Sequence, residues 1–177
     1  MFMSSIDLVI LGMLLEKPQS AYEIQKDIEY HHFSRWTKIS IPSIYKKVHH
    51  LKEKGYLNSQ VKKGSKLAKK AVYSITDEGK SYFFQLMKDC VDQPVSFIFD
   101  FNVVITNLNK IEKDKALELI DELRNRITSS SQENRQYADL YRDIPLVGKT
   151  VFKQQQLLYD SLLQWLDDFE TQFKLGG

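Results

Sequence analysis

The chain has 177 residues, of which 42% are hydrophobic and 27% are charged, as in an ordinary folded domain and unlike a disordered chain. Its most apolar stretches, residues 6–15 and 95–105, fall short of the roughly 20 apolar residues that a bilayer requires, so we predict no membrane association. The single cysteine, Cys90, cannot form an internal disulfide, which favours a reducing, cytoplasmic setting.

The charge is unevenly distributed along the chain. Residues 1–90 hold 15 Lys and Arg against 9 Asp and Glu, whereas residues 91–177 hold 10 against 14. Residues 38–70 contain 10 basic residues and a single acid, Glu53. This pattern predicts one local surface for a polyanionic partner. A lysine-rich face that is merely solvated explains the charge equally well.

The first half begins with two predicted helices. Residues 6–16 carry apolar side chains at helical spacing and stop before Pro18. Ser20 then precedes Glu23 by three residues, which is the capping-box pattern of a helix start. We expect this second helix to run to about His31, followed by a polar and aromatic connection.

A third helix and two strands are predicted next. Ser40 and Pro42 suit the start of a helix, and Gly55 suits its end. Residues 56–62 and 71–75 fit strands around a basic turn at 63–70. Thr76 would cap a fourth helix through about Cys90, with Gly79 as an awkward interior residue. Three helices, a strand, a basic turn and a strand are the order of a winged helix-turn-helix.

The segment 91–94 is the predicted boundary, dividing a winged helix-turn-helix domain at residues 1–92 from a helical domain at 93–177. In the second half we expect helices at 97–108, at 113–141 and from Pro145 onward. The fold class is therefore mainly α with a small β-wing.

The last helix carries an apolar seam of the kind found in coiled coils. Two long amphipathic helices have little to pack on in one chain, so we predict that a partner subunit covers them in a homodimer. The alternative is that they fold back on each other within the chain. The seam consists of Val151, Leu158, Leu162, Trp165 and Phe169.

The third helix has the composition of a recognition helix, with Ile44, Val48 and Leu51 facing inward and polar side chains on the remaining arc. Lysines on the wing can lie along phosphates or reach the minor groove. We predict double-stranded DNA as the partner. The candidate DNA-binding residues are Tyr22, Lys38, Ser40, Ser43, Tyr45, Lys46, Lys47, His50, Lys62, Lys63, Lys66, Lys69 and Lys70.

Three segments resemble the signature of the PadR family of transcriptional regulators. They are Ser20–Ile24, the stretch from Ile44 to Leu57, and Tyr73–Gly79. Phe33 and Trp36, with the helical tail, are similar to the larger subgroup, which includes a virulence activator and phenolic-acid-responsive repressors. The resemblance implies a homodimer on an inverted-repeat operator, with repression as the default. It also implies that Tyr22, Tyr45 and the wing lysines contact DNA.

Other functions have weaker support. The pairs His31-His32 and His49-His50 suggest metal ligands, but neighbouring side chains on a helix diverge, so we predict no metal site and no cofactor. No nucleophile and base pair is readable, so we predict that the protein is not an enzyme. Trp36 and Trp165 could line a site for a small-molecule effector of unknown identity, although packing is the simpler role. A winged-helix adaptor that binds protein remains the alternative function.

Overall fold

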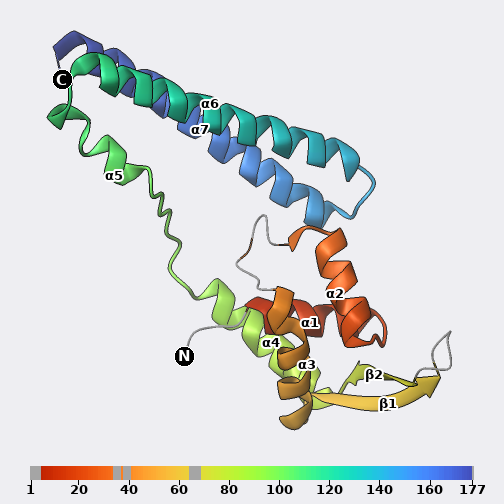
Figure 1. Ribbon diagram of the computed structural model, residues 1–177. Coiled ribbons are helices and arrows are strands. Elements are labelled where there is room, and N and C mark those ends of the chain that lie inside the picture. Colours follow the sequence, from red (N-terminus) through yellow and green to blue (C-terminus); the bar gives the residue numbers. More distant parts are fainter. Residues whose placement is uncertain (1–4, 34–36, 38–40, 64–68, 177) are drawn as a thin grey trace. The chain divides into compact units, whose positions relative to one another are not determined.

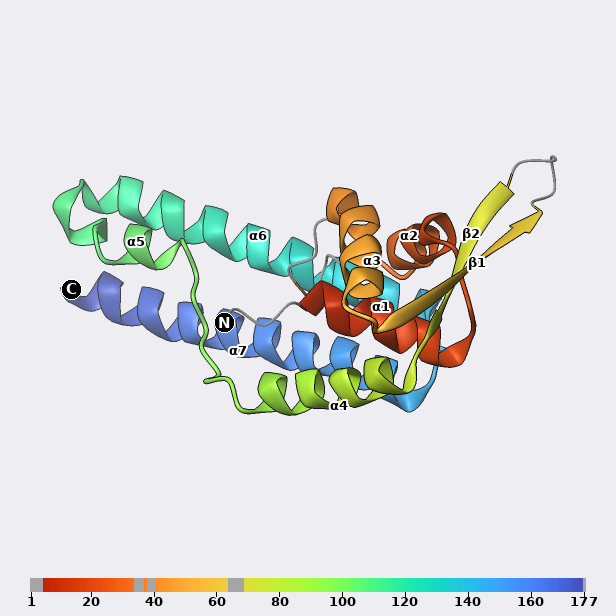
Figure 2. The same ribbon diagram turned by 90° about the horizontal axis from the view of Figure 1, so that it is seen from below.

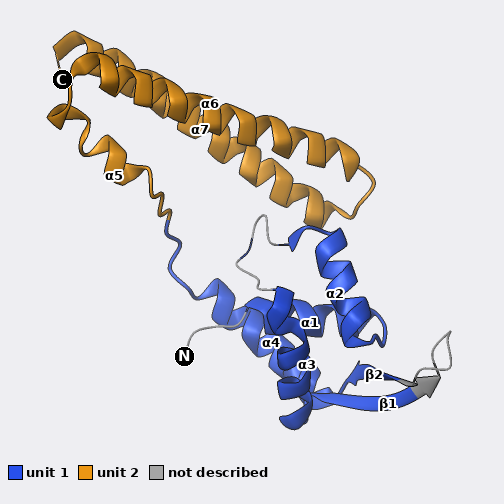
Figure 3. Cartoon of the chain, viewed as in Figure 1, with its two compact units in different colours: residues 1–96 blue, residues 97–177 orange. Residues whose placement is uncertain are grey.

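The computed structural model describes residues 5–33, 37, 41–63 and 69–176, without the side chains of residues 62, 63 and 69 (Figure 1). It divides into two compact units, Met1–Ser96 and Phe97–Gly177 (Figure 3). The mainly helical fold with a two-stranded wing, as predicted from the sequence, is confirmed. Within the described part of the chain, no helix is long and apolar enough to cross a membrane.

Three helices form the body of the first unit: α1 (Ser5–Glu16), α2 (Ala21–Tyr30) and α3 (Ile44–Glu53). Their apolar faces meet in one core, because each helix repeats apolar residues at a spacing of three or four. The fully buried side chains at its centre are Ile10, Leu11, Ile24, Ile28, Ile44, Val48 and Leu51.

The capping box predicted for α2 is present. The Ser20 side chain accepts a hydrogen bond from the Glu23 backbone, and the Glu23 carboxylate accepts one from the Ser20 backbone. The predicted start of the third helix is wrong, because a 3-10 helix, η2 (Ile41–Ser43), precedes α3 and includes Pro42. Proline lacks an N–H and restricts the residue before it, so the α-helical ladder begins only after this turn.

The wing is an antiparallel hairpin of β1 (Leu57–Lys63) and β2 (Lys69–Ile75). Its register pairs Leu57 with Ile75 at the base and Lys63 with Lys69 at the far end. β1 starts and ends one residue later than predicted and β2 starts two residues earlier, so Lys63 and Lys69 belong to the ladder and not to the turn. The hairpin extends beyond the helices of its own unit (Figures 1 and 2).

The helix α4 (Asp77–Val91) begins at Thr76, whose hydroxyl accepts a hydrogen bond from the Gly79 amide at 3.0 Å, as predicted. The structure also explains Gly79. A Cβ at this position would lie 2.2 Å from the Tyr56 carbonyl oxygen, so only glycine allows α4 to pass so close to the base of the wing.

The second unit starts with little regular structure. The predicted helix at 97–108 is wrong, because only one α-helical turn, α5 (Asn102–Ile105), and a 3-10 turn, η3 (Leu108–Lys110), form there. The one α-helical turn falls on the β-branched residues themselves, and Leu108, which follows it, is buried against the neighbouring helices.

Two long helices complete the second unit: α6 (Lys113–Leu140) and α7 (Leu146–Gly176). They lie side by side and antiparallel, joined by a short turn (Figures 1 and 2). Their shared core consists of Leu108, Ala116, Ile120, Ile127, Leu166 and Phe173. Nearer the turn the contact is polar, since Asn134 donates to the Phe152 carbonyl oxygen at 3.0 Å and Gln156 donates to Ser131 at 2.8 Å.

Candidate nucleic-acid interface

The outward face of α3 carries polar and aromatic side chains. Tyr45 is 50% exposed, and Lys46 and His50 are exposed beside it, because the core holds the opposite face of the helix. Hydroxyl, ammonium and imidazole groups can donate hydrogen bonds to base edges or phosphates. The described part of α3 therefore has the residue types of a helix that reads a DNA groove.

The helix α2 adds two side chains to this face. Tyr22 is 59% exposed, and the Lys26 Nζ lies 5.8 Å from the centre of its ring. A hydrogen bond to Glu29 is the main cause that raises the pKa of Lys26, with smaller contributions from Tyr22 and Tyr45. Sequence reasoning missed Lys26, although its position four residues after Tyr22 on a predicted helix places the two side chains on one face.

Lys47 is arranged differently from its neighbour Lys46. Its Nζ lies 3.3 Å from both carboxylate oxygens of Asp7, a residue of α1 whose side chain is only 7% exposed. The Lys47 side chain is itself 31% exposed. The structure thus places this candidate DNA-binding residue in an ion pair that joins α3 to α1.

Lys70 also has an acidic partner within the same unit. Its Nζ lies 2.8 Å from Oε1 of Glu23, and both side chains are a little under half exposed. Hydrogen bonds from Lys70, then from the Ser20 hydroxyl and amide, lower the pKa of Glu23 to about 2. The sequence indicated the cap at Glu23, but not this pairing with a residue 47 positions away.

The remaining candidate DNA-binding residues are only partly described. Ser43 is half-buried at the N-cap position of α3. For Lys62, Lys63 and Lys69 the structure describes the strand backbone and not the side chains. Lys38, Ser40 and Lys66 lie outside the described residues, as does Trp36.

The predicted dimer seam lies along one side of α7. Leu162 and Phe169 pack against the α6–α7 core within one chain. Val151 and Leu158 are half-buried outside that core, and Trp165 is 37% exposed. Trp165 also stacks between Phe101 and Phe169, with ring centres 6.1 Å apart in each case, so its observed role is packing.

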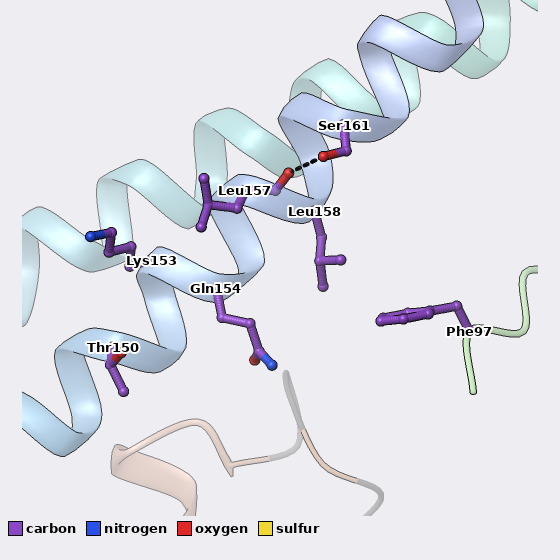
Figure 4. Close-up of a pocket in the computed structure, with 7 residues that line it drawn as sticks. All are labelled: Phe97, Thr150, Lys153, Gln154, Leu157, Leu158 and Ser161. Carbon is purple, nitrogen blue, oxygen red and sulfur yellow. Dashed lines mark hydrogen bonds between the residues drawn. The ribbon is translucent and has the colours of Figure 1, made fainter. Parts of the chain in front are cut away.

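A pocket of about 410 Å³ lies beside this seam (Figure 4). The Phe97 ring is directed toward the face of α7 that carries Leu158 (Figure 4). The wall on α7 is formed by Thr150, Lys153, Gln154, Leu157, Leu158 and Ser161. The pocket is wide open, and its mixed lining does not select a chemical class of ligand.

The described residues include no group of three or more His, Cys, Asp or Glu side chains that could hold a metal ion. His49 and His50 instead lie near Glu53, with Nδ1 to carboxylate distances of 3.4 and 4.0 Å.

Comparison with known proteins identifies a protein family that the first unit matches. Residues 10–85 match the sequence profile of the transcriptional regulator PadR-like family. This range contains α2, α3 and both strands of the wing. No curated protein sequence matches the chain.

Solved structures resemble the chain over nearly its whole length. Bacillus subtilis PadR in complex with operator DNA matches with a TM-score of 0.78 and 15% identity, over 96% of this chain and 99% of that chain. The PadR-like transcriptional regulator BC1756 from Bacillus cereus gives 0.70 and 22%, over 97% and 99%. The Vibrio cholerae virulence activator AphA gives 0.69 and 18%, also over 97% and 99%.

At these identities the structural likeness establishes the fold, and the family profile establishes what kind of domain the first unit is. The family consists of transcriptional regulators and not of enzymes. The winged helix-turn-helix of this chain is therefore a domain of the PadR-like family of transcriptional regulators.

Proposed function

We propose that the chain is a DNA-binding repressor that binds an inverted-repeat operator as a homodimer. In this proposal α3 enters the major groove and the wing lies on the backbone or in the minor groove. The observation that carries it is the outward face of α3 and α2, where Tyr45 and Lys46 are exposed beside Tyr22 and Lys26. Bacillus subtilis PadR, which shares the fold, was crystallised with operator DNA.

The homodimer is supported by the apolar surface of the second unit. Ile98 is 85% exposed, and Leu146 and Val147 are 79% and 77% exposed. Large exposed apolar side chains of this kind are what a subunit interface would bury. A second copy of the chain would cover them, and a two-fold axis would place two recognition helices on two half-sites.

The proposal is tested by recovering fragments of the source genome that the purified protein retains, followed by footprinting on the recovered fragments. We expect a protected site with two-fold symmetry, and expression from the adjacent promoter should rise when the protein is deleted. Retention that is independent of sequence would contradict the proposal and favour the protein-binding adaptor. A fall in expression on deletion would instead indicate an activator.

A small-molecule effector stays a prediction without an assigned site. Bacillus subtilis PadR was also crystallised with p-coumaric acid, at 15% identity to this chain. Direct titration of phenolic acids against the protein–operator complex would test the prediction, with release of DNA as the expected result.

A further inference from the structure

The wing is attached to the rest of its unit at two points, one just before α2 and one on α2 itself. The first is a pair of backbone hydrogen bonds, from the Gln19 amide to the Tyr73 carbonyl at 3.1 Å and from the Tyr73 amide to the Gln19 carbonyl at 2.8 Å. The second is the ion pair between Lys70 on β2 and Glu23 on α2. The backbone contact holds the base of the wing, so the ion pair is not required to keep the hairpin on the domain.

The Glu23 carboxylate is fixed without help from Lys70. Its Oε2 accepts hydrogen bonds from the Ser20 amide at 2.8 Å and from the Ser20 hydroxyl at 2.6 Å, which leaves Oε1 for the lysine. The carboxylate also lies in the first turn of α2, where the helix dipole favours a negative charge. Lys70 can therefore leave while the carboxylate stays in place.

This carboxylate competes for a cation that the proposed DNA complex would use. Glu23 follows Tyr22, a candidate DNA-binding residue that is 59% exposed, and the Glu23 and Lys70 side chains are 44% and 43% exposed. A phosphate oxygen and a carboxylate oxygen are alternative acceptors for one ammonium group. The low pKa of Glu23, about 2, keeps its charge at neutral pH.

We propose that Glu23 lowers the affinity of the wing for DNA by pairing with Lys70 in the free protein. A DNA phosphate must then displace the Glu23 carboxylate before it can bind the Lys70 ammonium group. The inference rests on the proposed function, since it requires that the wing meets phosphates. In the complex Lys70 exchanges a carboxylate for a phosphate, and the bare Glu23 takes up a counterion. Binding through Lys70 thus releases fewer ions than a contact made by an unpaired lysine.

The test is the affinity for DNA of the Glu23→Gln variant of the full chain, measured over a range of salt concentrations. Glutamine is compatible with the capping box, so the helix start should persist. We expect tighter binding to random and operator DNA by up to about fivefold per subunit, since an exposed ion pair is worth up to about 1 kcal/mol. The slope of log affinity against log salt should steepen by up to about 0.9 per subunit.

Two further variants separate competition from a simple change in net charge. Asp77→Asn removes the same charge from an exposed pair with the same 2.8 Å distance, to Lys80 on α4, and should change affinity much less. In a Lys70→Ala background, Glu23→Gln should give little gain. The inference would be overturned if Glu23→Gln and Asp77→Asn changed the affinity for DNA equally. It would also be overturned if Glu23→Gln still raised the affinity in the Lys70→Ala background. If the parent protein binds no DNA, the proposed function itself fails.

Discussion

Lys46 and Lys47 are neighbours on α3, yet the structure gives them opposite environments. Lys46 is exposed, whereas the Lys47 ammonium group forms an ion pair with the buried Asp7 carboxylate. A buried charge is costly when its partner is removed. The first lysine therefore belongs to the surface proposed to read DNA, and the second has a role in holding α3 on α1.

Replacing each lysine with alanine should separate these roles. Lys47→Ala should lower the free energy of unfolding by about 1–3 kcal/mol, below the range for a fully buried pair because Lys47 is partly exposed. Lys46→Ala should lower it by less than about 0.5 kcal/mol. Urea denaturation of both variants provides the measurement, and equal losses would mean that the Asp7 pair does not stabilise the domain.

Gly79 and Gly12 are both helical glycines, but alanine should affect stability differently at the two positions. Alanine normally stabilises a helix relative to glycine by about 1 kcal/mol. At Gly79, however, the added Cβ would meet the Tyr56 carbonyl oxygen at 2.2 Å, so Gly79→Ala should destabilise the domain by about 1–3 kcal/mol. Gly12→Ala on α1 is the control, since its Cβ would meet Phe83 at an ordinary 3.4 Å and the variant should keep or gain stability. A Gly79→Ala variant as stable as its parent would refute this close approach.

The helices differ in how far their sequences determine them. The patterns of α1, α2 and α4 are local, with Ser20 and Thr76 capping the last two as predicted, because a cap depends on residues within three positions. The predicted start of the third helix was wrong because Pro42 lies in a 3-10 turn that precedes α3. The predicted helix at 97–108 was wrong because apolar spacing alone does not make a helix, and only residues 102–105 form an α-helical turn there.

Contacts between distant elements were not predictable from spacing. The sequence indicated which face of α3 is polar, but not that Asp7 pairs with Lys47 or that Glu23 pairs with Lys70. Each of these acids lies 40 or more positions from its lysine, so no periodicity connects them. Charge counts alone therefore overstated the number of unpaired lysines at the candidate interface.

Some residues of the α7 seam pack within the chain, whereas others are available for the proposed dimer interface. Leu162 and Phe169 already pack within the chain, so a charge at either position would disturb the α6–α7 pair itself. Leu158 lies outside that core and is the better probe of the proposed dimer.

Leu158→Asp should place a charge in the proposed interface, which costs several kcal/mol when unpaired. Sedimentation at micromolar concentration should then show a monomer with its helices intact by circular dichroism. Ser129→Asp, at an exposed position of α6, is the matched control and should remain dimeric. A Leu158→Asp variant that stays dimeric would place the interface elsewhere.

At the scale of the whole molecule, we propose that the first unit reads DNA and that the second unit pairs the subunits. The family profile covers the first unit, whereas the second resembles solved PadR-like proteins in fold. Loss of dimerisation should therefore weaken operator binding without changing which bases one domain prefers, since each half-site is read by its own α3.

The central claim, that the outward face of α3 reads sequence, is tested most directly by Lys46→Ala on the recovered operator. Lys52→Ala is the control, because Lys52 is an equally charged and exposed residue in the last turn of the same helix. One lost base contact costs about 1–3 kcal/mol, and a symmetric dimer loses it twice. We predict that Lys46→Ala lowers operator affinity at least about tenfold and affinity for random DNA much less, with a smaller effect of Lys52→Ala on the operator. Equal losses on operator and random DNA, or no loss on either, would contradict the account.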